Sequence, residues 1–149
     1  QQANQIPWGV LLLFAGGICL ARGFVASGLS AQVGEALTLV AALPVFLMML
    51  LLALVVTFLT EATSNTATTA LLMPVLAAVA LAVDIDPLWL MVPAAMSASC
   101  AFMLPVATAP NAVVFGSGEL PIQRMVREGF VLNLFGAIVI AGLMTLILS

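Results

Sequence analysis

A run of hydroxyl and amide side chains interrupts a long apolar stretch near the middle of the sequence. The ten residues Thr60 to Thr69 hold five threonines, one serine and one asparagine, with no Gly, Pro, Lys or Arg, which is unlike an ordinary solvated turn. Oxygen donors of this kind suit a hard cation such as sodium. Hydroxyl, amide and backbone N–H donors at the start of the following helix suit a carboxylate. The run therefore predicts a site with a cation on one side and a carboxylate on the other.

A second interruption follows at Pro105 to Asn111, where two prolines stand five residues apart. Each proline removes a helical hydrogen-bond donor and clashes with an earlier carbonyl, so a helix must break here. Discontinuous membrane helices free carbonyls for a cation and point helix N-termini at an anion. The two interruptions are therefore candidate parts of one ligand site.

Each of these features also has a purely structural interpretation. Serine and threonine in membrane helices often bond a carbonyl of the preceding turn and bind nothing else, and a single proline kink is common. Asn65 and Asn111 each need a partner, because an unpaired amide is costly in lipid. Glu61 is the only acid well inside an apolar region. It is either a proton-coupling carboxylate or, as we favour, a structural partner at a helix end.

The composition defines the surroundings of these residues. The 149 residues are 64% hydrophobic and 6% charged, with a mean hydropathy of +1.32, whereas soluble domains carry about 25% charged residues. Lipid must be the main solvent, so we expect an all-α integral membrane protein. There is no basic patch for nucleic acid and no nucleophile–base pair. We therefore expect neither an enzyme nor an organic cofactor, and we interpret Cys19 and Cys100 as packing residues.

The apolar segments predict the helices that position the two interruptions. About 20 helical residues cross a hydrocarbon core of about 30 Å. We expect a spanning helix over about 6–25, an interfacial arm over about 27–40 and a hairpin over about 41–83 with its tip at 60–69. The first limb, 43–59, reaches only about 25 Å at 1.5 Å per residue. A re-entrant hairpin therefore fits better than a full crossing with its loop in water.

The rest of the sequence predicts two further helices. Residues 84–87 form an aqueous turn, and a helix over about 88–118 is broken at 105–111. The connector 119–128 carries two of the three arginines, which places it in the cytoplasm by the positive-inside rule. A final helix covers about 130–148. The first residues, Gln1 to Gln5, include neither an initiator Met nor a basic signal-peptide region, and we interpret the sequence as a segment of a longer chain.

Three stretches resemble one transporter family. Thr60 to Ala67 closely resembles the second Ser-Asn-Thr motif of the divalent-anion/sodium symporters, the INDY-type dicarboxylate transporters. Ser99 to Ala112 is similar to the family signature around its Thr-x-Pro motif, and Pro7 to Phe14 is similar to the start of a late helix. The two motif blocks together are specific, and the similarity covers essentially the whole chain in the right order.

The resemblance implies a fold of two inverted repeats, each with a re-entrant hairpin and a discontinuous transmembrane helix, assembled as a homodimer. This sequence would be the C-terminal part of the second repeat. The implied sodium ligands are Thr60, Thr63, Ser64, Asn65 and Ala107, some of them through backbone carbonyls. The implied substrate-binding residues are Ser64, Asn65, Thr66, Thr108 and Pro110. The first hairpin and the first sodium site lie outside this sequence, so the remainder of the transporter must supply half of the site.

The function implied is sodium-coupled symport of a di- or tricarboxylate such as succinate, by a multi-pass protein of the plasma membrane. Sodium would order the hairpin tip, the anion would then bind, and the loaded domain would move against a fixed scaffold in an elevator-type mechanism. Such ordering fits an ion that shifts the population toward the conformation it binds better. Two alternatives remain. One is an exchanger or a proton-coupled transporter of another divalent anion, in which Glu61 would matter. The other is a non-transporting membrane scaffold.

Overall fold

The chain is helical throughout the part that the structure describes. The structure is a computed structural model that describes residues 8–40 and 43–148. Over these residues the chain forms helices and no strand, which confirms the all-α expectation. The helices are α1 (Trp8–Ala26), α2 (Leu29–Val40), α3 (Val45–Glu61), α4 (Asn65–Ala82), α5 (Leu88–Ser97), α6 (Ala109–Gly116) and α7 (Ile122–Leu148).

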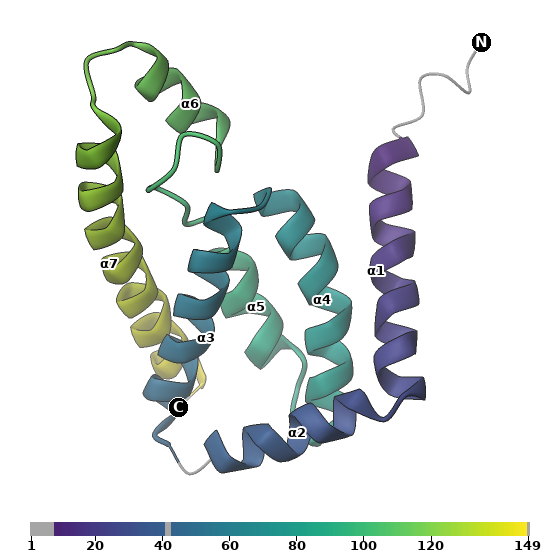
Figure 1. Cartoon of the computed structure of the whole chain (residues 1–149). Coiled ribbons are helices and arrows are strands. Elements are labelled where there is room, and N and C mark those ends of the chain that lie inside the picture. The colour runs from purple at the N-terminus through teal and green to yellow at the C-terminus, as the bar shows by residue number, and fades with distance from the viewer. Residues whose placement is uncertain (1–7, 41–42, 149) are drawn as a thin grey trace.

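The helices form one bundle with α2 lying across one end (Figure 1). Helices α3 and α4 form a hairpin whose tip lies at the opposite end from α2. The hairpin packs on α7 through α3 and on α1 through α4, while α5 contacts α3, α4 and α7. Short α6 lies beyond the hairpin tip, so the segment between α5 and α6 passes beside that tip (Figure 1). The fold therefore brings both interruptions to the same end of the bundle.

The loop at the hairpin tip is shorter than the sequence suggested. Helix α3 continues through Glu61 and α4 begins at Asn65, so the loop is 62–64 and not the whole of 60–69. Threonine hydroxyls in α4 and in the loop bond carbonyls of the preceding turn. Thr69 Oγ1 donates to the Asn65 carbonyl at 2.8 Å, and Thr63 Oγ1 donates to the Leu59 carbonyl at 3.0 Å.

The helix break lies earlier in the chain than the predicted 105–111. Helix α5 ends at Ser97 and α6 begins at Ala109, which leaves residues 98–108 non-helical. Pro110 is in the first turn of α6, where a missing N–H costs nothing, so the helix resumes before Asn111. Upstream, α5 ends at Ser97, eight residues before Pro105, so the proline, which restricts only the residue directly before it, does not set where this helix stops.

The last helix also starts earlier than the expected 130. Helix α7 begins at Ile122, where the carbonyl of Pro121 accepts hydrogen bonds from the N–H groups of Arg124 and Met125. Its first turns carry the charged residues that we assigned to a connector. The charges do not prevent a helix, because Arg124, Arg127 and Glu128 are exposed.

Small side chains allow the helices to approach closely. Between α3 and α7 the buried cluster consists of Met49, Ala53, Ala137, Ile140, Ala141 and Met144, and its three alanines are fully buried. Between α3 and α5 the cluster consists of Val56, Ala94 and Ala98, with Leu72, Met73 and Leu76 of α4 packed against it. Small residues at such contacts are typical of helix packing in lipid.

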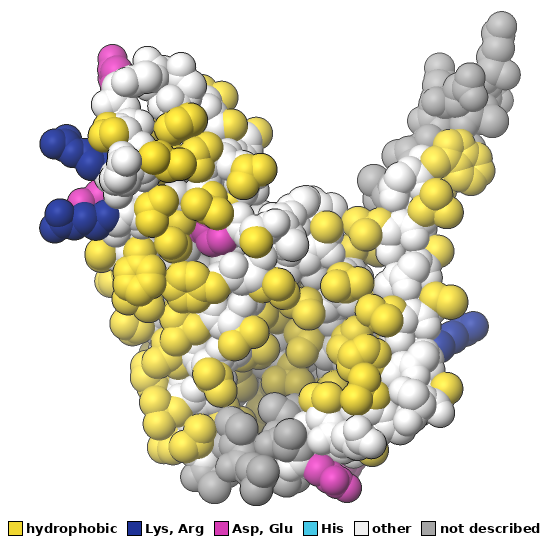
Figure 2. Space-filling view, viewed as in Figure 1, with side chains coloured by type: hydrophobic (Ala, Val, Ile, Leu, Met, Phe, Trp, Pro, Cys, Tyr) yellow, Lys and Arg dark blue, Asp and Glu magenta, His cyan; other side chains and the backbone are white. Residues whose placement is uncertain are grey.

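The outer surface is largely apolar, as a lipid-facing surface must be. Figure 2 shows hydrophobic side chains over most of one face, with few charged ones. Phe135 is 65% exposed, Leu12 69% and Ile147 72%. By length and composition, α4 and α7 could each cross a membrane. Apolar exposure on this scale points to a membrane or to partner surfaces around the bundle.

Candidate functional site: the hairpin tip and the helix break

The tip presents polar groups at the start of α4. Ser64 occupies the N-cap position, and its carbonyl accepts the Thr68 N–H at 2.8 Å. Its hydroxyl makes no capping hydrogen bond and the residue is exposed, as is Thr66. Thr63 is also exposed, and its hydroxyl lies against the hydroxyl of Thr68. The first N–H groups of a helix have no partner within it, so this end of α4 offers N–H and O–H donors together.

Beneath the tip lies a cluster of oxygen atoms with too few hydrogens. Thr60 is fully buried, and its Oγ1 lies 2.8 Å from Asn65 Oδ1 and 2.9 Å from the carbonyl of Ala98. A hydroxyl has one hydrogen, so it can serve only one of these two acceptors fully. Among the described residues, the buried Ser97 Oγ has no hydrogen-bond partner. Surplus oxygen lone pairs of this kind suit a hard cation.

Glu61 connects the tip to the break. Its Oε1 accepts the N–H groups of Phe102 at 2.7 Å and Met103 at 2.8 Å, and its Oε2 accepts that of Leu104 at 3.0 Å. Oε1 also accepts Asn133 Nδ2 of α7 at 2.7 Å. Both Glu61 and Asn133 are buried. The carboxylate therefore joins the end of α3, the break and α7.

Asn133 did not figure in our sequence-based site. A signal for it exists, because an asparagine inside the apolar stretch 130–148 must find a partner in lipid. The sequence contains no indication of which partner it finds. That partner is Glu61, 72 residues earlier in the chain.

The far half of the break is held by Asn111 and Thr108. Asn111 Nδ2 donates to the carbonyls of Ala101 at 2.9 Å and Leu104 at 3.0 Å. Thr108 is the N-cap of α6, and its Oγ1 accepts the Asn111 N–H at 3.2 Å. Ala107 is buried and its N–H bonds the Leu104 carbonyl, whereas Pro110 is exposed. Asn111 thus has the partners that its cost in lipid requires.

The predicted site residues fall into two groups with different connections. Thr60 and Asn65 belong to the cluster that includes Ala98, and Glu61 bonds residues 102–104. Within the described part of the chain, no hydrogen bond joins residues 60–66 to residues 107–110. The tip therefore bonds the first half of the break directly. It is linked to the second half through Leu104, whose N–H bonds Glu61 and whose carbonyl bonds Asn111.

A cavity of about 370 Å³ opens beside the tip. Asn65 and Thr66 line it together with Thr69 and Ser99, which the sequence interpretation had not included. Thr69 lies four residues after Asn65 and so shares its helix face, which is a signal that could have found it. The remaining lining residues are Phe14, Ile18, Ala70, Met73 and Pro74. Ser64, Thr108 and Pro110 do not line this cavity.

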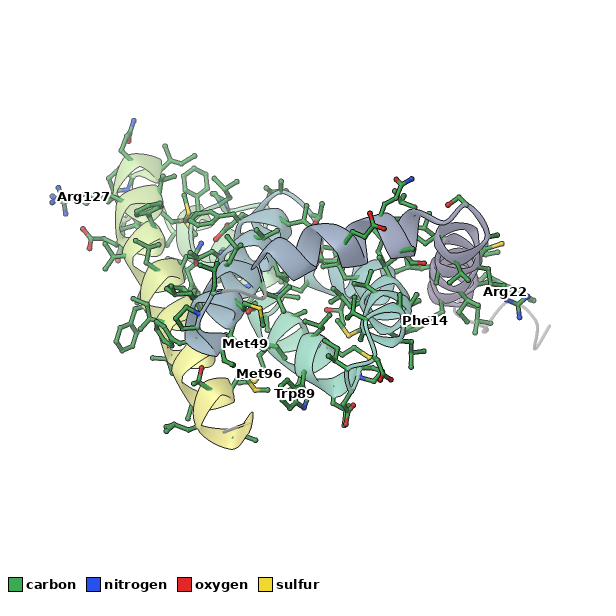
Figure 3. The ribbon with its side chains drawn as sticks, turned by 90° about the horizontal axis from the view of Figure 1, so that it is seen from below. Phe14, Arg22, Met49, Trp89, Met96 and Arg127 are labelled. Atoms are coloured by element: carbon green, nitrogen blue, oxygen red, sulfur yellow. The ribbon has the colours of Figure 1, made fainter. Side chains whose placement is uncertain are left out.

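No basic side chain lines the cavity. In Figure 3 the labelled Arg22 and Arg127 lie at opposite ends of the molecule and point away from it, whereas Met49 lies inside the bundle. Among residues 8–40 and 43–148, no group of three or more His, Cys, Asp or Glu side chains could hold a metal ion. An anion here would be recognised by hydroxyl, amide and backbone N–H donors, assisted by any cation already bound.

Lipid-facing helices with two polar interruptions at one end define an integral membrane protein with discontinuous helices. Residues 2–148 match the family described as the sodium:sulfate symporter transmembrane region. The chain belongs to this family, which confirms the resemblance to the divalent-anion/sodium symporters, and it is a multi-pass protein of the plasma membrane.

Two named relatives are closely similar in sequence. A sodium-dependent dicarboxylate transporter of Staphylococcus saprophyticus is 50% identical over 138 residues, which are 93% of this chain and 27% of the relative. A protein of the same name from Staphylococcus aureus strain USA300 is 49% identical over 138 residues, covering 93% of this chain and 26% of the relative. The chain thus spans about a quarter of the length of these relatives.

Proposed function

We propose that this chain supplies one half of the binding site of a sodium-coupled transporter of di- or tricarboxylates. The observation that carries the proposal is the oxygen cluster beneath the tip, where the single hydrogen of the Thr60 hydroxyl lies between two acceptors, Asn65 Oδ1 and the Ala98 carbonyl. Ser97, the residue before Ala98, adds a buried hydroxyl that has no partner among the described residues. Two relatives at 49–50% identity are named as sodium-dependent dicarboxylate transporters, which agrees with this chemistry.

Four of the proposed sodium ligands lie at the end of α3 and in the turn to α4: Thr60, Thr63, Ser64 and Asn65. The fifth, Ala107, comes from the break and would act through its backbone. Sodium binding would satisfy the acceptors that the single Thr60 hydrogen leaves over. It would also hold Asn65 against the break, because the Asn65 Oδ1 is one of the atoms in the cluster.

The proposed substrate-binding residues come from both interruptions. They are Ser64, Asn65 and Thr66 at the tip, and Thr108 and Pro110 at the start of α6. The uncapped N-terminus of α4 supports this proposal, since a helix N-terminus carries partial positive charge and free N–H groups. Because no arginine lines the cavity, bound sodium would supply the positive charge that a carboxylate needs. Sodium would therefore bind first.

The remaining parts of the proposal concern the whole transporter. The chain forms the last part of a second inverted repeat, with α3 and α4 as a re-entrant hairpin. A first hairpin outside residues 1–149 completes the site. The transporter works as a homodimer in which the loaded domain moves across the membrane against a scaffold.

The test is sodium-dependent succinate uptake into membrane vesicles by the complete transporter that contains this sequence. Asn65→Ala and Thr108→Ala should each reduce uptake at least about tenfold, as expected when a hydrogen bond to a ligand is lost. The control is Thr145→Val, near the C-terminal end of α7, and it should leave uptake unchanged. Unchanged uptake in both site variants would refute the site, and uptake without sodium would refute the coupling ion. Sulfate and citrate as competitors define the substrate class.

A further inference from the structure

The carboxylate of Glu61 is saturated by donors from two distant parts of the chain. Three of its hydrogen bonds come from consecutive backbone N–H groups of the break, at 2.7 to 3.0 Å, and one comes from Asn133 at 2.7 Å. Only 4% of its surface is exposed. Such bonds to a carboxylate are stronger than those between neutral groups.

The break needs an acceptor at this position. Residues 102–104 are not helical, so their N–H groups lack the carbonyl partners that a continuous helix would provide. Irregular backbone at membrane depth is tolerated only where the protein satisfies it. An ionised carboxylate has two oxygens with about four lone-pair sites and can accept several N–H groups at once, whereas the amide of Asn or Gln has one acceptor oxygen with two.

Helix α7 also holds the break, through Asn133 and Gly129. Asn133 is fully buried, and its Oδ1 accepts the Phe102 N–H at 3.3 Å while its Nδ2 donates to Glu61. One turn earlier, Gly129 lets the backbone of the break lie directly on the helix. A Cβ at Gly129 would lie 2.3 Å from the Phe102 carbonyl oxygen and 2.7 Å from the Met103 Cα. Gly129 and Asn133 share one helix face because they are four residues apart.

We propose that Glu61 and Asn133 form an acid–amide pair that positions the break against the hairpin tip. Glu61 is a positioning residue: it holds residues 102–104 and, through them, fixes the Ala98 carbonyl beside Thr60. All four of its partners are N–H donors. None of them can take up a carboxyl proton, so the contacts favour a fixed acceptor over a proton carrier. The effect on sodium rests on the proposed function, whereas the effect on the break does not.

The first measurement is hydrogen–deuterium exchange of the complete transporter, because it reads the three backbone N–H groups directly. Glu61→Gln should accelerate exchange in the peptide that covers residues 98–108 by about tenfold or more, since one lost charge-assisted acceptor opens these amides. Glu128→Gln, an exposed glutamate of α7, is the matched control and should change nothing. Unchanged exchange in Glu61→Gln would overturn the proposal.

The second measurement separates positioning from direct ligand binding. In sodium-driven succinate uptake, Glu61→Gln should raise the sodium concentration for half-maximal uptake about tenfold and change the maximal rate much less. The exchanged pair Glu61→Gln/Asn133→Asp keeps one acid and one amide with the same net charge. It should restore slow exchange and most of the sodium response. If the exchanged pair fails to restore slow exchange, or fails to restore the sodium response, the proposed role of the pair is overturned.

A third variant covers the case in which Glu61→Gln does not fold. Asn133→Leu keeps the three backbone bonds to Glu61 and removes only the amide contacts. Faster exchange near Phe102 supports the proposal, and unchanged exchange overturns it. If the unaltered transporter shows no sodium-driven uptake, the proposed function fails, while the exchange measurements still decide the role of Glu61.

Discussion

The hairpin tip and the helix break are both interruptions of apolar helices, but their polar groups come from different parts of the residues. The tip loop is short, 62–64, and its polarity lies in side chains such as Ser64 and Thr63. The break is long, 98–108, and its polarity lies largely in backbone groups. Those groups are satisfied by side chains from outside it, Glu61, Asn111 and Asn133.

This difference separates ligand chemistry from structural support. Side chains at the tip can be exchanged with little harm to the backbone, because the two flanking helices satisfy their own hydrogen bonds. The break has no such independence, since its conformation rests on three side chains and one glycine. Substitutions in the supports of the break should therefore cost stability, whereas substitutions at the tip should cost sodium and anion binding.

The largest effect is expected at Gly129. Gly129→Ala places a Cβ 2.3 Å from the Phe102 carbonyl oxygen and 2.6 Å from its carbonyl carbon. Backbone atoms cannot move aside as a flexible side chain can, so we expect a loss of about 3 kcal/mol of unfolding free energy. This loss is measured by comparing the unfolding free energies of the variant and the unaltered protein in mixed detergent micelles. Gly142→Ala in the same helix has nothing within 4 Å of the new Cβ and should be neutral or slightly stabilising. Equal stability of the two variants would mean that the break does not lie on α7.

A smaller loss is expected at Asn111. Asn111→Ala removes the donor to the carbonyls of Ala101 and Leu104, and leaving partly buried acceptors unpaired costs about 2 kcal/mol. Ser117→Ala, at the exposed end of α6, is the control and should change stability by less than about 0.5 kcal/mol. The same unfolding assay applies. A neutral Asn111→Ala variant would show that water or lipid headgroups reach these carbonyls.

The same difference explains what the sequence could and could not predict. The tip was identifiable because its signal is side-chain identity, such as Asn65 among hydroxyls. The position of the break was not, because Pro105 and Pro110 mark where a helix cannot continue and not where it stops. Helix α5 ends earlier, at Ser97, and the free N–H groups of residues 102–104 find acceptors in Glu61 and Asn133.

Contacts between distant residues were out of reach for a related reason. Glu61 is 41 to 43 residues from its backbone partners and 72 from Asn133. Residue type and spacing show that a buried acid and a buried amide each need a partner, but not that they find each other. The structural role that we favoured for Glu61 from the sequence agrees with its contacts, although the sequence could not name them.

At the tip, Thr60→Val should affect sodium more than folding. Valine has a similar shape but lacks the hydroxyl between Asn65 Oδ1 and the Ala98 carbonyl. We expect a loss of about 1 kcal/mol in stability and a roughly tenfold higher sodium requirement for uptake. Thr57→Val is the matched control, one turn earlier on α3 and equally buried, with a single bond of 3.4 Å to the Ser97 carbonyl. A sodium response that is the same in both variants would remove Thr60 from the proposed site.

The smallest effect on stability is expected at Ser97, and it is the most specific for the oxygen cluster. The Ser97 hydroxyl is buried without a partner among the described residues, so Ser97→Ala removes a polar group that makes no hydrogen bond to them. Its unfolding free energy without sodium should change by at most about 0.5 kcal/mol, in either direction. If the hydroxyl completes the cation site, sodium should stabilise the variant less than the unaltered protein. A ligand that binds only the folded state stabilises it by RT ln(1 + [L]/Kd), so melting temperatures across a sodium series measure this difference directly. A large loss of stability without sodium would show that the hydroxyl already has a partner, and equal sodium stabilisation would separate Ser97 from the cluster around Thr60.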